Sequence, residues 1–170
     1  MIIGQTGAGK STLAFKLAEI AKLPVFHTDQ FFWMPGWIQR PTEECEKLCN
    51  EAIAKEHWII EGSFSQNWPA RLNRAEMLIC LDLPYPLRLV RILRRSWRDY
   101  GYTRLDMPDN CPERFSPEFY KWTWTSRRER AEELRRFSDS APSSKTKYHL
   151  RSSNAVRSFL TEFKEKYGRT

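Results

Sequence analysis

Residues 4–11 match in full the phosphate-binding pattern of a glycine, four free positions and then Gly-Lys-Ser. An apolar segment, residues 1–3, precedes this loop, and apolar residues at helical spacing follow it, so a strand, a tight loop and a helix are expected in this order. Glycines permit the sharp turn, the backbone N–H groups then enclose an anion, and the helix directs its positive end toward that anion. The pattern predicts that the chain binds a nucleoside triphosphate.

The residues of this loop have separate predicted roles. The charge of Lys10 is expected near the β- and γ-phosphates, where it also serves catalysis, and the hydroxyl of Ser11 is expected to bind Mg²⁺. The predicted nucleotide-binding residues of the loop are Gly4, Thr6, Gly7, Ala8, Gly9, Lys10, Ser11 and Thr12.

Composition limits the class of protein. A length of 170 residues favours a single domain over 1–170, and 41% hydrophobic with 29% charged residues is ordinary for a soluble globular chain. No apolar run reaches membrane-spanning length and no secretory signal precedes the loop, so a cytoplasmic protein without membrane contact is expected. The four cysteines lack Cys-x-x-Cys spacing, which favours free thiols over a zinc site or a disulfide framework.

Short apolar runs alternate with segments of helical periodicity. The predicted strands are 1–3, 23–27, 58–60, 77–82 and 147–150, and the predicted helices lie from 12 onward and over 42–55, 84–100, 117–137 and 156–163. This alternation is typical of an α/β three-layer sandwich with a parallel sheet covered by helices on both faces. Ligands of such sheets bind at the carboxyl ends of the strands, where Asp29, Glu61 and Asp82 are expected.

These acidic residues carry different predictions. A carboxylate at Asp29 is suited to orient or deprotonate an acceptor hydroxyl, or to hold Mg²⁺ through water, and capping a helix or turn is its alternative role. Glu61 stands where a Walker-B-type acid near Mg²⁺ is expected. For Asp82, a functional role and a capping role are both open. His27 either contacts substrate or makes a structural hydrogen bond.

An aromatic segment, residues 31–37, contains proline and glycine and is expected to be irregular. Trp33 and Trp37 within it have two open interpretations. They either stack on a base or clamp an acceptor, or they pack the segment onto the core.

Most of the arginines lie between 88 and 136, and many flank an aperiodic segment, residues 101–115, with two prolines. A mobile segment with arginines at its ends is suited to close over the γ-phosphate, neutralise its charge and exclude water. The candidates are Arg91, Arg94, Arg95, Arg104, Arg127, Arg128 and Arg130, of which Arg91, Arg95 and Arg127 are predicted to be catalytic. The alternative is a solvated helix face with salt bridges, such as Arg128 with Glu132.

Further motifs follow one another along the chain in a fixed order. They are His27-x-Asp29-x-x-Phe32-Trp33-x-Pro35-Gly36-Trp37, Trp58-Ile59-Ile60-Glu61-Gly62, Arg104-x-Asp106-Met107-x-x-x-Cys111-Pro112-Glu113 and Leu150-Arg151-Ser152. Together with the loop, they make the whole chain resemble the FlaR-type "DNA topology modulation" proteins, a branch of the adenylate-kinase-like NMP kinases within the P-loop proteins.

This resemblance implies a five-stranded parallel sheet with strand order 2-3-1-4-5, and ATP with Mg²⁺ as cofactors. It implies an acceptor-binding region at 31–74 and a lid at 101–115. It also implies that the loop near 151–154, and with it Arg151, lies by the adenine. The family usually has aspartate where Glu61 stands, and it leaves the acceptor of this chain open.

Three functions are open at this stage. The favoured one is a small kinase that moves the γ-phosphoryl group of ATP to a small-molecule acceptor, with a nucleotide or nucleoside favoured over other hydroxyl compounds. The second is an ATP-dependent DNA-associated regulator, which a net charge of +7 permits, although no DNA-reading motif is present. The third is an ATPase or GTPase switch, but no Asn-Lys-x-Asp segment is present to read guanine. The sequence gives no indication of an oligomeric state.

Overall fold

The computed structural model describes residues 1–168 and contains a five-stranded parallel sheet. Its strands are β1 (Ile2–Gly4), β2 (Val25–His27), β5 (Ile59–Glu61), β6 (Met77–Leu81) and β7 (Thr146–Leu150). They lie in the order β2-β5-β1-β6-β7, with Ile2 opposite both Glu61 and Ile79. Counted within this sheet, the order is 2-3-1-4-5, so the predicted α/β fold is confirmed.

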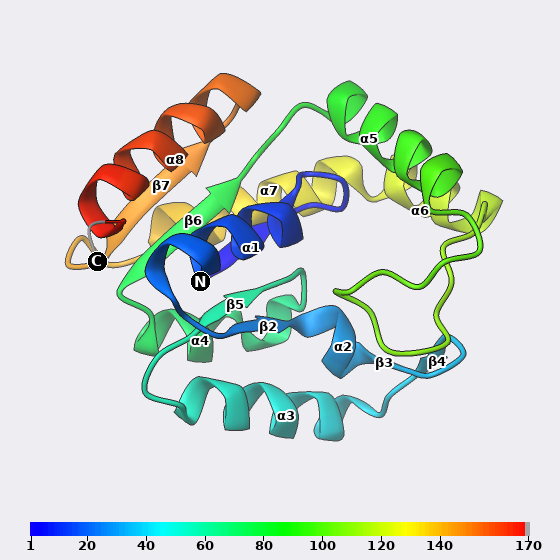
Figure 1. The fold of residues 1–170 in the computed structure, drawn as a ribbon, viewed down its shortest axis with the longest axis horizontal. Helices are drawn as coiled ribbons and strands as arrows, with labels where there is room; N and C mark the ends of the chain where they lie inside the picture. Colours follow the sequence, from blue (N-terminus) through cyan, green and yellow to red (C-terminus); the bar gives the residue numbers. More distant parts are fainter. Residues whose placement is uncertain (169–170) are drawn as a thin grey trace.

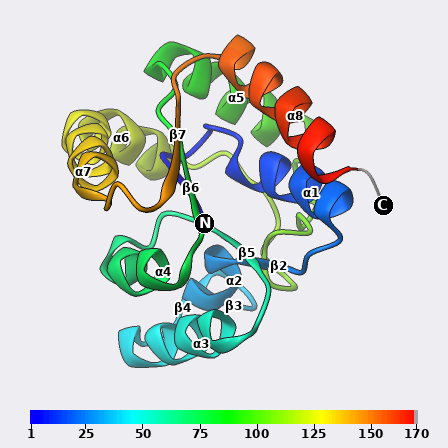
Figure 2. The ribbon, with the colours of Figure 1, turned by 90° about the vertical axis from the view of Figure 1, so that its left-hand side faces the viewer.

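Helices cover both faces of the sheet (Figure 1). They are α1 (Lys10–Ala21), α2 (Thr28–Phe32), α3 (Thr42–Ala54), α4 (Trp68–Arg74), α5 (Tyr85–Arg98), α6 (Pro117–Thr125), α7 (Arg127–Ser140) and α8 (Ser153–Tyr167), with a 3-10 turn at Ser65–Asn67. Figure 2 shows α1 and α8 on one side of the sheet and α4 and α7 on the other. None of the described helices combines the length and the apolar character needed to cross a membrane.

The alternation of side chains along the central strands produces the three layers. Ile2 and Leu81 belong to the core beneath α1 and α8, whereas Ile3 and Cys80 belong to the core beneath α4 and α7. Both faces of β1 and β6 are therefore buried, which accounts for their continuous apolar sequence. The carboxyl ends of the strands lie at one edge of the sheet, where β1 runs directly into the phosphate loop.

The prediction of one continuous helix over 117–137 is wrong. The structure has two helices, α6 and α7, with a break at Ser126. Hydroxyl groups explain the break: Thr125 Oγ1 donates to the Lys121 carbonyl at 3.0 Å, and Ser126 Oγ donates to the Trp122 carbonyl at 2.7 Å. Such side-chain bonds compete with the backbone bonds that would continue a helix.

The prediction of an irregular segment at 31–37 is also wrong. Its first two residues end α2, and an antiparallel hairpin of β3 (Trp33–Met34) and β4 (Ile38–Gln39) follows. Gly36, at φ +82, and Trp37, at φ +63, make the turn of this hairpin. Left-handed backbone at these positions lets the chain reverse within the loop 35–37, between the paired residues Met34 and Ile38.

Candidate functional site

The phosphate loop has the geometry of an anion site. Gly7 and Gly9 adopt φ angles of +78 and +92, and a Cβ atom at Gly7 would lie only 2.6 Å from the Arg88 carbonyl oxygen. Helix α1 begins at Lys10 without a side-chain cap, so its first N–H groups have no side-chain partner and remain available to a phosphate. Lys10 itself reaches the Gln5 carbonyl at 3.5 Å.

Two arginines of α5 support this loop from outside. The buried Arg88 donates from Nη1 to the Thr6 carbonyl at 3.1 Å and from Nε to the Leu83 carbonyl at 3.1 Å. Arg91 donates to the Ala8 carbonyl and to Ser153 Oγ, each at 3.1 Å. Positive charge on the loop carbonyls favours an anion at the N–H groups of the same loop.

Arg88 holds the phosphate loop, and the sequence analysis did not single it out. Burial lowers the pKa of its guanidinium from the ordinary arginine value, yet both its hydrogen bonds hold backbone carbonyls rather than a carboxylate. A sequence signal exists in hindsight, because Arg88 shares helical spacing with Ile92 and Ser96, and all three positions of α5 are buried.

A cleft of about 1650 Å³ opens over the loop. Residues 6–13, the β3–β4 hairpin, the 101–115 segment and α5 all contribute to its lining, whereas Gly4 is outside the lining. The volume exceeds the roughly 300–1,000 Å³ typical of a site for one drug-sized ligand. The cleft therefore has room for a nucleotide together with a second small molecule.

Ser11 and Glu61, the two predicted magnesium-binding residues, are in contact: Ser11 Oγ donates to Glu61 Oε1 at 3.1 Å. His27, which is also buried, places its Nδ1 atom 2.7 Å from the same oxygen and so makes a structural hydrogen bond. A hydroxyl and a carboxylate suit Mg²⁺, which keeps several waters and takes its remaining ligands from phosphates. Within residues 1–168, no group of three or more His, Cys, Asp or Glu residues is placed to hold a metal ion.

Asp29 lies in the first turn of α2, and its side chain lines the cleft. Burial raises the pKa of this carboxyl above the ordinary value of an aspartate, and the nearby Glu61 raises it further. Lys10 and Arg104 act in the opposite direction, with smaller effects. A carboxylate of raised basicity at the wall of a cleft is suited to take a proton from a hydroxyl group.

Gly62 allows the backbone next to Glu61 to approach the backbone next to Asp29 closely. Its φ is +139, and a Cβ atom there would overlap Thr28 Oγ1 and lie 2.8 Å from Thr28 Cβ. The buried Thr28 directly precedes Asp29, and Gly62 directly follows Glu61. The absence of a side chain at position 62 therefore allows the two acidic corners to pack against each other.

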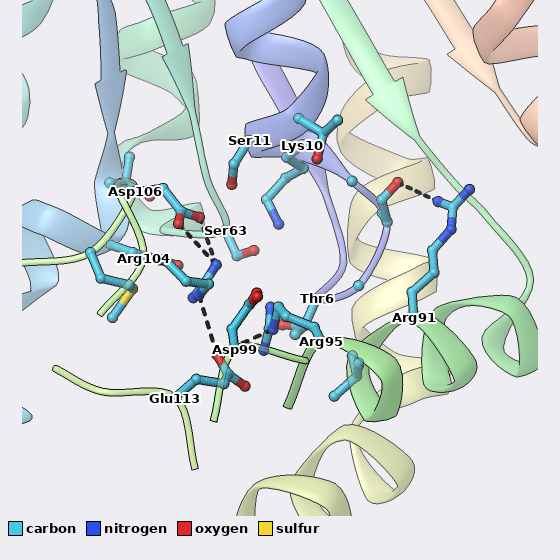
Figure 3. A pocket seen from close by; sticks show the side chains of 18 of the residues that line it. Thr6, Lys10, Ser11, Ser63, Arg91, Arg95, Asp99, Arg104, Asp106 and Glu113 are labelled. Atoms are coloured by element: carbon cyan, nitrogen blue, oxygen red, sulfur yellow. Dashed lines mark hydrogen bonds and ion pairs between the residues drawn. The ribbon is translucent and has the colours of Figure 1, made fainter. Parts of the chain in front are cut away.

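The arginines nearest the centre of the cleft are held by carboxylates. Arg104 lies 2.7 Å from Asp106 and 3.2 Å from Glu113, and Arg95 lies 3.3 Å from Glu113. Figure 3 shows the Lys10 and Arg104 side chains directed into the same part of the cleft, with Asp106 and Glu113 on either side of Arg104. Burial lowers the pKa of Arg95, and the neighbouring Arg104 lowers it further.

Other predicted residues lie elsewhere. Arg127 stacks its guanidinium over Trp124, 3.5 Å from the ring centroid, and is not part of the cleft lining. Arg151 is exposed and also outside the lining, whereas Ser153 and three residues of the following turns of α8 line the cleft.

Three further candidates are placed as follows. Arg94 lines the cleft, as does Arg130, whose partner at 3.4 Å is Glu133. Asp82 pairs with Arg135 at 2.8 Å and His149 at 3.2 Å, and it does not cap α5, whose N-cap is Pro84.

The 101–115 segment is fastened to the β3–β4 hairpin, and Figure 1 shows the two lying together beyond the end of α2. The Gly36 N–H donates to the Asn110 carbonyl at 2.9 Å, and the Trp37 indole N–H donates to the Pro112 carbonyl at 3.1 Å. The Trp37 backbone N–H donates to Cys111 Sγ at 3.4 Å. The two segments thus form one unit across the mouth of the cleft.

Comparison with known proteins gives the fold a name. No protein-family model matches the chain, and no curated protein matches it significantly. An unliganded sugar kinase from Janibacter sp. HTCC2649 is similar, with a TM-score of 0.53 and 16% identity over 97% of this chain and 88% of its own. Shikimate kinase from Acinetobacter baumannii, in complex with shikimate, has a TM-score of 0.51 and 15% identity over 95% of this chain and 87% of its own. At these identities the likeness shows the shared fold alone, the α/β fold of P-loop kinases.

Proposed function

We propose that this protein is a small-molecule kinase, which transfers the γ-phosphoryl group of ATP to a hydroxyl group of a nucleotide, a nucleoside or another small compound. One observation carries the proposal: the phosphate loop and Asp29 line a single cleft that is large enough for two ligands. The likeness to a sugar kinase and a shikimate kinase supports a kinase at this general level.

In the proposed reaction, the loop N–H groups and Lys10 bind the β- and γ-phosphates. Ser11, with Glu61 oriented by His27, would hold Mg²⁺, which when bound neutralises phosphate charge. Lining residues at the start of α8, Ser153 among them, provide space for the nucleoside. The cytoplasm, where ATP and Mg²⁺ are abundant, is the proposed location.

The transfer step needs positioning and charge neutralisation more than covalent help from the protein. The acceptor oxygen attacks the γ-phosphorus, the bond from that phosphorus to the leaving oxygen of ADP breaks, and Asp29 takes the proton of the hydroxyl group. We propose that the 101–115 segment acts as the lid, that residues 31–74 form the acceptor side, and that Arg95 and Arg104 neutralise the transferred group. Closure of such a lid excludes water and so limits wasteful hydrolysis.

The first test is consumption of ATP by the pure protein with Mg²⁺ in the presence of nucleoside monophosphates, nucleosides and small metabolites. Acceptor-dependent formation of ADP and of a phosphorylated product is expected. A parallel measurement adds duplex DNA at several salt concentrations. If no acceptor is phosphorylated, but DNA binds in a salt-dependent and ATP-modulated manner, the DNA-associated regulator replaces the kinase as the better proposal.

Replacement of Asp29 by asparagine is expected to slow phosphotransfer by about 100- to 10,000-fold while changing ATP affinity little, because the lost group acts on the acceptor proton. The same variant is expected to be more stable than the parent at neutral pH. The pKa of Asp29 is higher in the folded chain, so its ionised form opposes folding above the unfolded pKa of about 3.9, and this penalty disappears below that pH.

Phosphotransfer rates, ATP binding and thermal unfolding between pH 4 and 8 check these expectations. Asp139→Asn, which changes an exposed aspartate of α7 outside the cleft, is the matched control and should alter none of the three. An unchanged rate in Asp29→Asn would assign Asp29 a structural role only.

A further inference from the structure

The acceptor side of the cleft has an unusual distribution of charge. Its wall comes from residues 28–42 and 63–66, and the lining residues among them are aromatic or neutral hydrogen-bonding side chains, with Asp29 as the sole ionisable group among the described ones. Trp33 and Trp37 pack edge to face, with ring centroids 5.4 Å apart at 77°. Gln39 and Gln66 add amide groups to this wall.

The cations of this region are turned away from the wall. Arg40 donates to the Phe31 carbonyl at 2.9 Å and pairs with Glu44 at 3.4 Å, outside the cleft lining. Arg71 is 0% exposed, and it donates to the Phe64 carbonyl at 2.7 Å from beneath the wall. Neither guanidinium can reach a ligand in the cleft without a rearrangement of the wall.

Opposite the wall, the arginines of α5 and of the 101–115 segment that lie nearest the centre of the cleft are already in ion pairs. Arg95 and Arg104 share Glu113, and Arg104 also holds Asp106. Arg95 and Arg104 are therefore already paired with carboxylates, although Arg94 and Arg98 also line the cleft. Behind the wall, Nε and Nη1 of the buried Arg71 have no hydrogen-bond partner, but they do not reach the lining. Arg114 lies at the exposed rim, with its guanidinium 5.5 Å from the Trp37 ring centroid.

We infer that the acceptor is an uncharged, polyhydroxylated ring compound, a free nucleoside or a free sugar, and that its phosphorylated counterparts are discriminated against. This inference rests on the proposed kinase function. Aromatic rings contact the faces of a base or sugar ring, and neutral amides with one carboxylate pair with hydroxyl groups. A phosphate dianion would meet the Asp29 carboxylate on a wall that contributes no cation to the lining, and like charges repel at short range. Arg95 and Arg104, opposite this wall, are already paired with Asp106 and Glu113.

The charge distribution also assists release of the product. After transfer, the acceptor oxygen carries a phosphate group, and the proton of its hydroxyl has passed to Asp29. The phosphate of the product then lies beside Arg95 and Arg104, which Glu113 and Asp106 already pair, and the wall contributes no lining cation to retain it. Product release is a common limit on turnover, so an acceptor side without free cations favours repeated cycles.

The test compares matched free and phosphorylated acceptors at equal concentration: adenosine with AMP, guanosine with GMP, uridine with UMP, and glucose with glucose 6-phosphate. ADP formation is expected to be at least tenfold faster with the free member of the pair that the protein uses. The nucleoside pairs and the sugar pair show which of the two kinds of acceptor the protein uses. Faster turnover with the phosphorylated members would overturn the inference while keeping the kinase.

Binding measurements distinguish the proposed neutral-acceptor site from the proposed kinase function. Calorimetry with the protein saturated with Mg²⁺ and ADP measures affinity for the same compounds without turnover. If free compounds bind but are never phosphorylated, the proposal of a site for neutral ligands is supported and the proposed kinase function is refuted. Absence of binding by all free members, with binding of any phosphorylated member, would refute the site.

A charge-insertion variant provides an independent readout. Gln66→Arg places a cation on the exposed part of the wall and is expected to improve use or binding of the phosphorylated members at least tenfold relative to the free ones. Gln66→Met, of similar size but uncharged, removes the same amide without adding a charge, and it should not improve use or binding of the phosphorylated members. If Arg114→Ala in the unmodified wall abolishes binding of a phosphorylated acceptor that the parent prefers, the rim arginine is a phosphate site and the inference is wrong.

Discussion

Replacing Lys10 by alanine is expected to reduce phosphotransfer by about 1,000-fold or more, because one preorganised charge at a transferring phosphoryl group contributes at least this order of rate enhancement. Lys10 opens α1 and lines the cleft beside the loop, where its only protein partner among the described hydrogen bonds is the Gln5 carbonyl at 3.5 Å. Its removal breaks no buried ion pair. The variant should therefore keep the thermal stability of the parent.

The measurement is single-turnover transfer from ATP at saturating acceptor, with circular dichroism to establish that the variant is folded. Lys47→Ala is the matched control, because Lys47 is an exposed lysine on α3 outside the cleft lining. Full turnover by a folded Lys10→Ala protein would remove Lys10 from the proposed catalytic residues and would contradict the assignment of the cleft to phosphotransfer.

Replacing Gly62 by alanine is expected to destabilise the protein by about 2–4 kcal/mol, which is a large part of the stability of an ordinary domain. Two costs combine at this position. The φ of +139 disfavours any side chain, and the added methyl group would overlap Oγ1 of the buried Thr28 and lie 2.8 Å from its Cβ. Because Thr28 precedes Asp29, the surviving folded protein should also transfer phosphate more slowly.

Gly36→Ala separates the two costs. Gly36 has a φ of +82, but no atom lies within 4 Å of the place that an added methyl group would occupy, so this substitution carries the backbone cost alone, about 1 kcal/mol. Urea unfolding of both variants measures the difference. Equal destabilisation by the two substitutions would show that the contact between Gly62 and Thr28 is loose, and that it does not position the acidic corners.

The fold was predictable because its signals are local. The loop pattern sets a strand, a turn and a helix by itself, and the apolar run at 77–82 is long enough to indicate a strand buried on both faces. The contact of Ser11 with Glu61 follows the rule that adjacent parallel strands end at one edge. The strand order, in contrast, came from family resemblance rather than from any pattern in the residues.

The remaining features depend on contacts between distant segments, which no local pattern contains. The carbonyl partners of Arg88 lie in the phosphate loop and two residues beyond the end of β6. Arg127 stacks on Trp124 rather than lining the cleft. Hydroxyl groups at 125 and 126 outweigh the helical periodicity of their surroundings. Arg151 is exposed and outside the cleft lining, whereas α8, which begins at Ser153, brings its own first turns to the cleft.

The bond between the 101–115 segment and the hairpin has a consequence for protein engineering. Gln30 also takes part, since its amide donates to the Leu105 carbonyl at 3.0 Å. A graft that exchanges only residues 101–115 with those of another kinase would leave the donors of Gly36 and Trp37 facing foreign carbonyls. The transplantable module is instead the pair of segments, residues 30–39 together with 101–115. Chimeras that exchange both segments should fold. In them, the choice of acceptor and the contacts of the 101–115 segment should be transferred together.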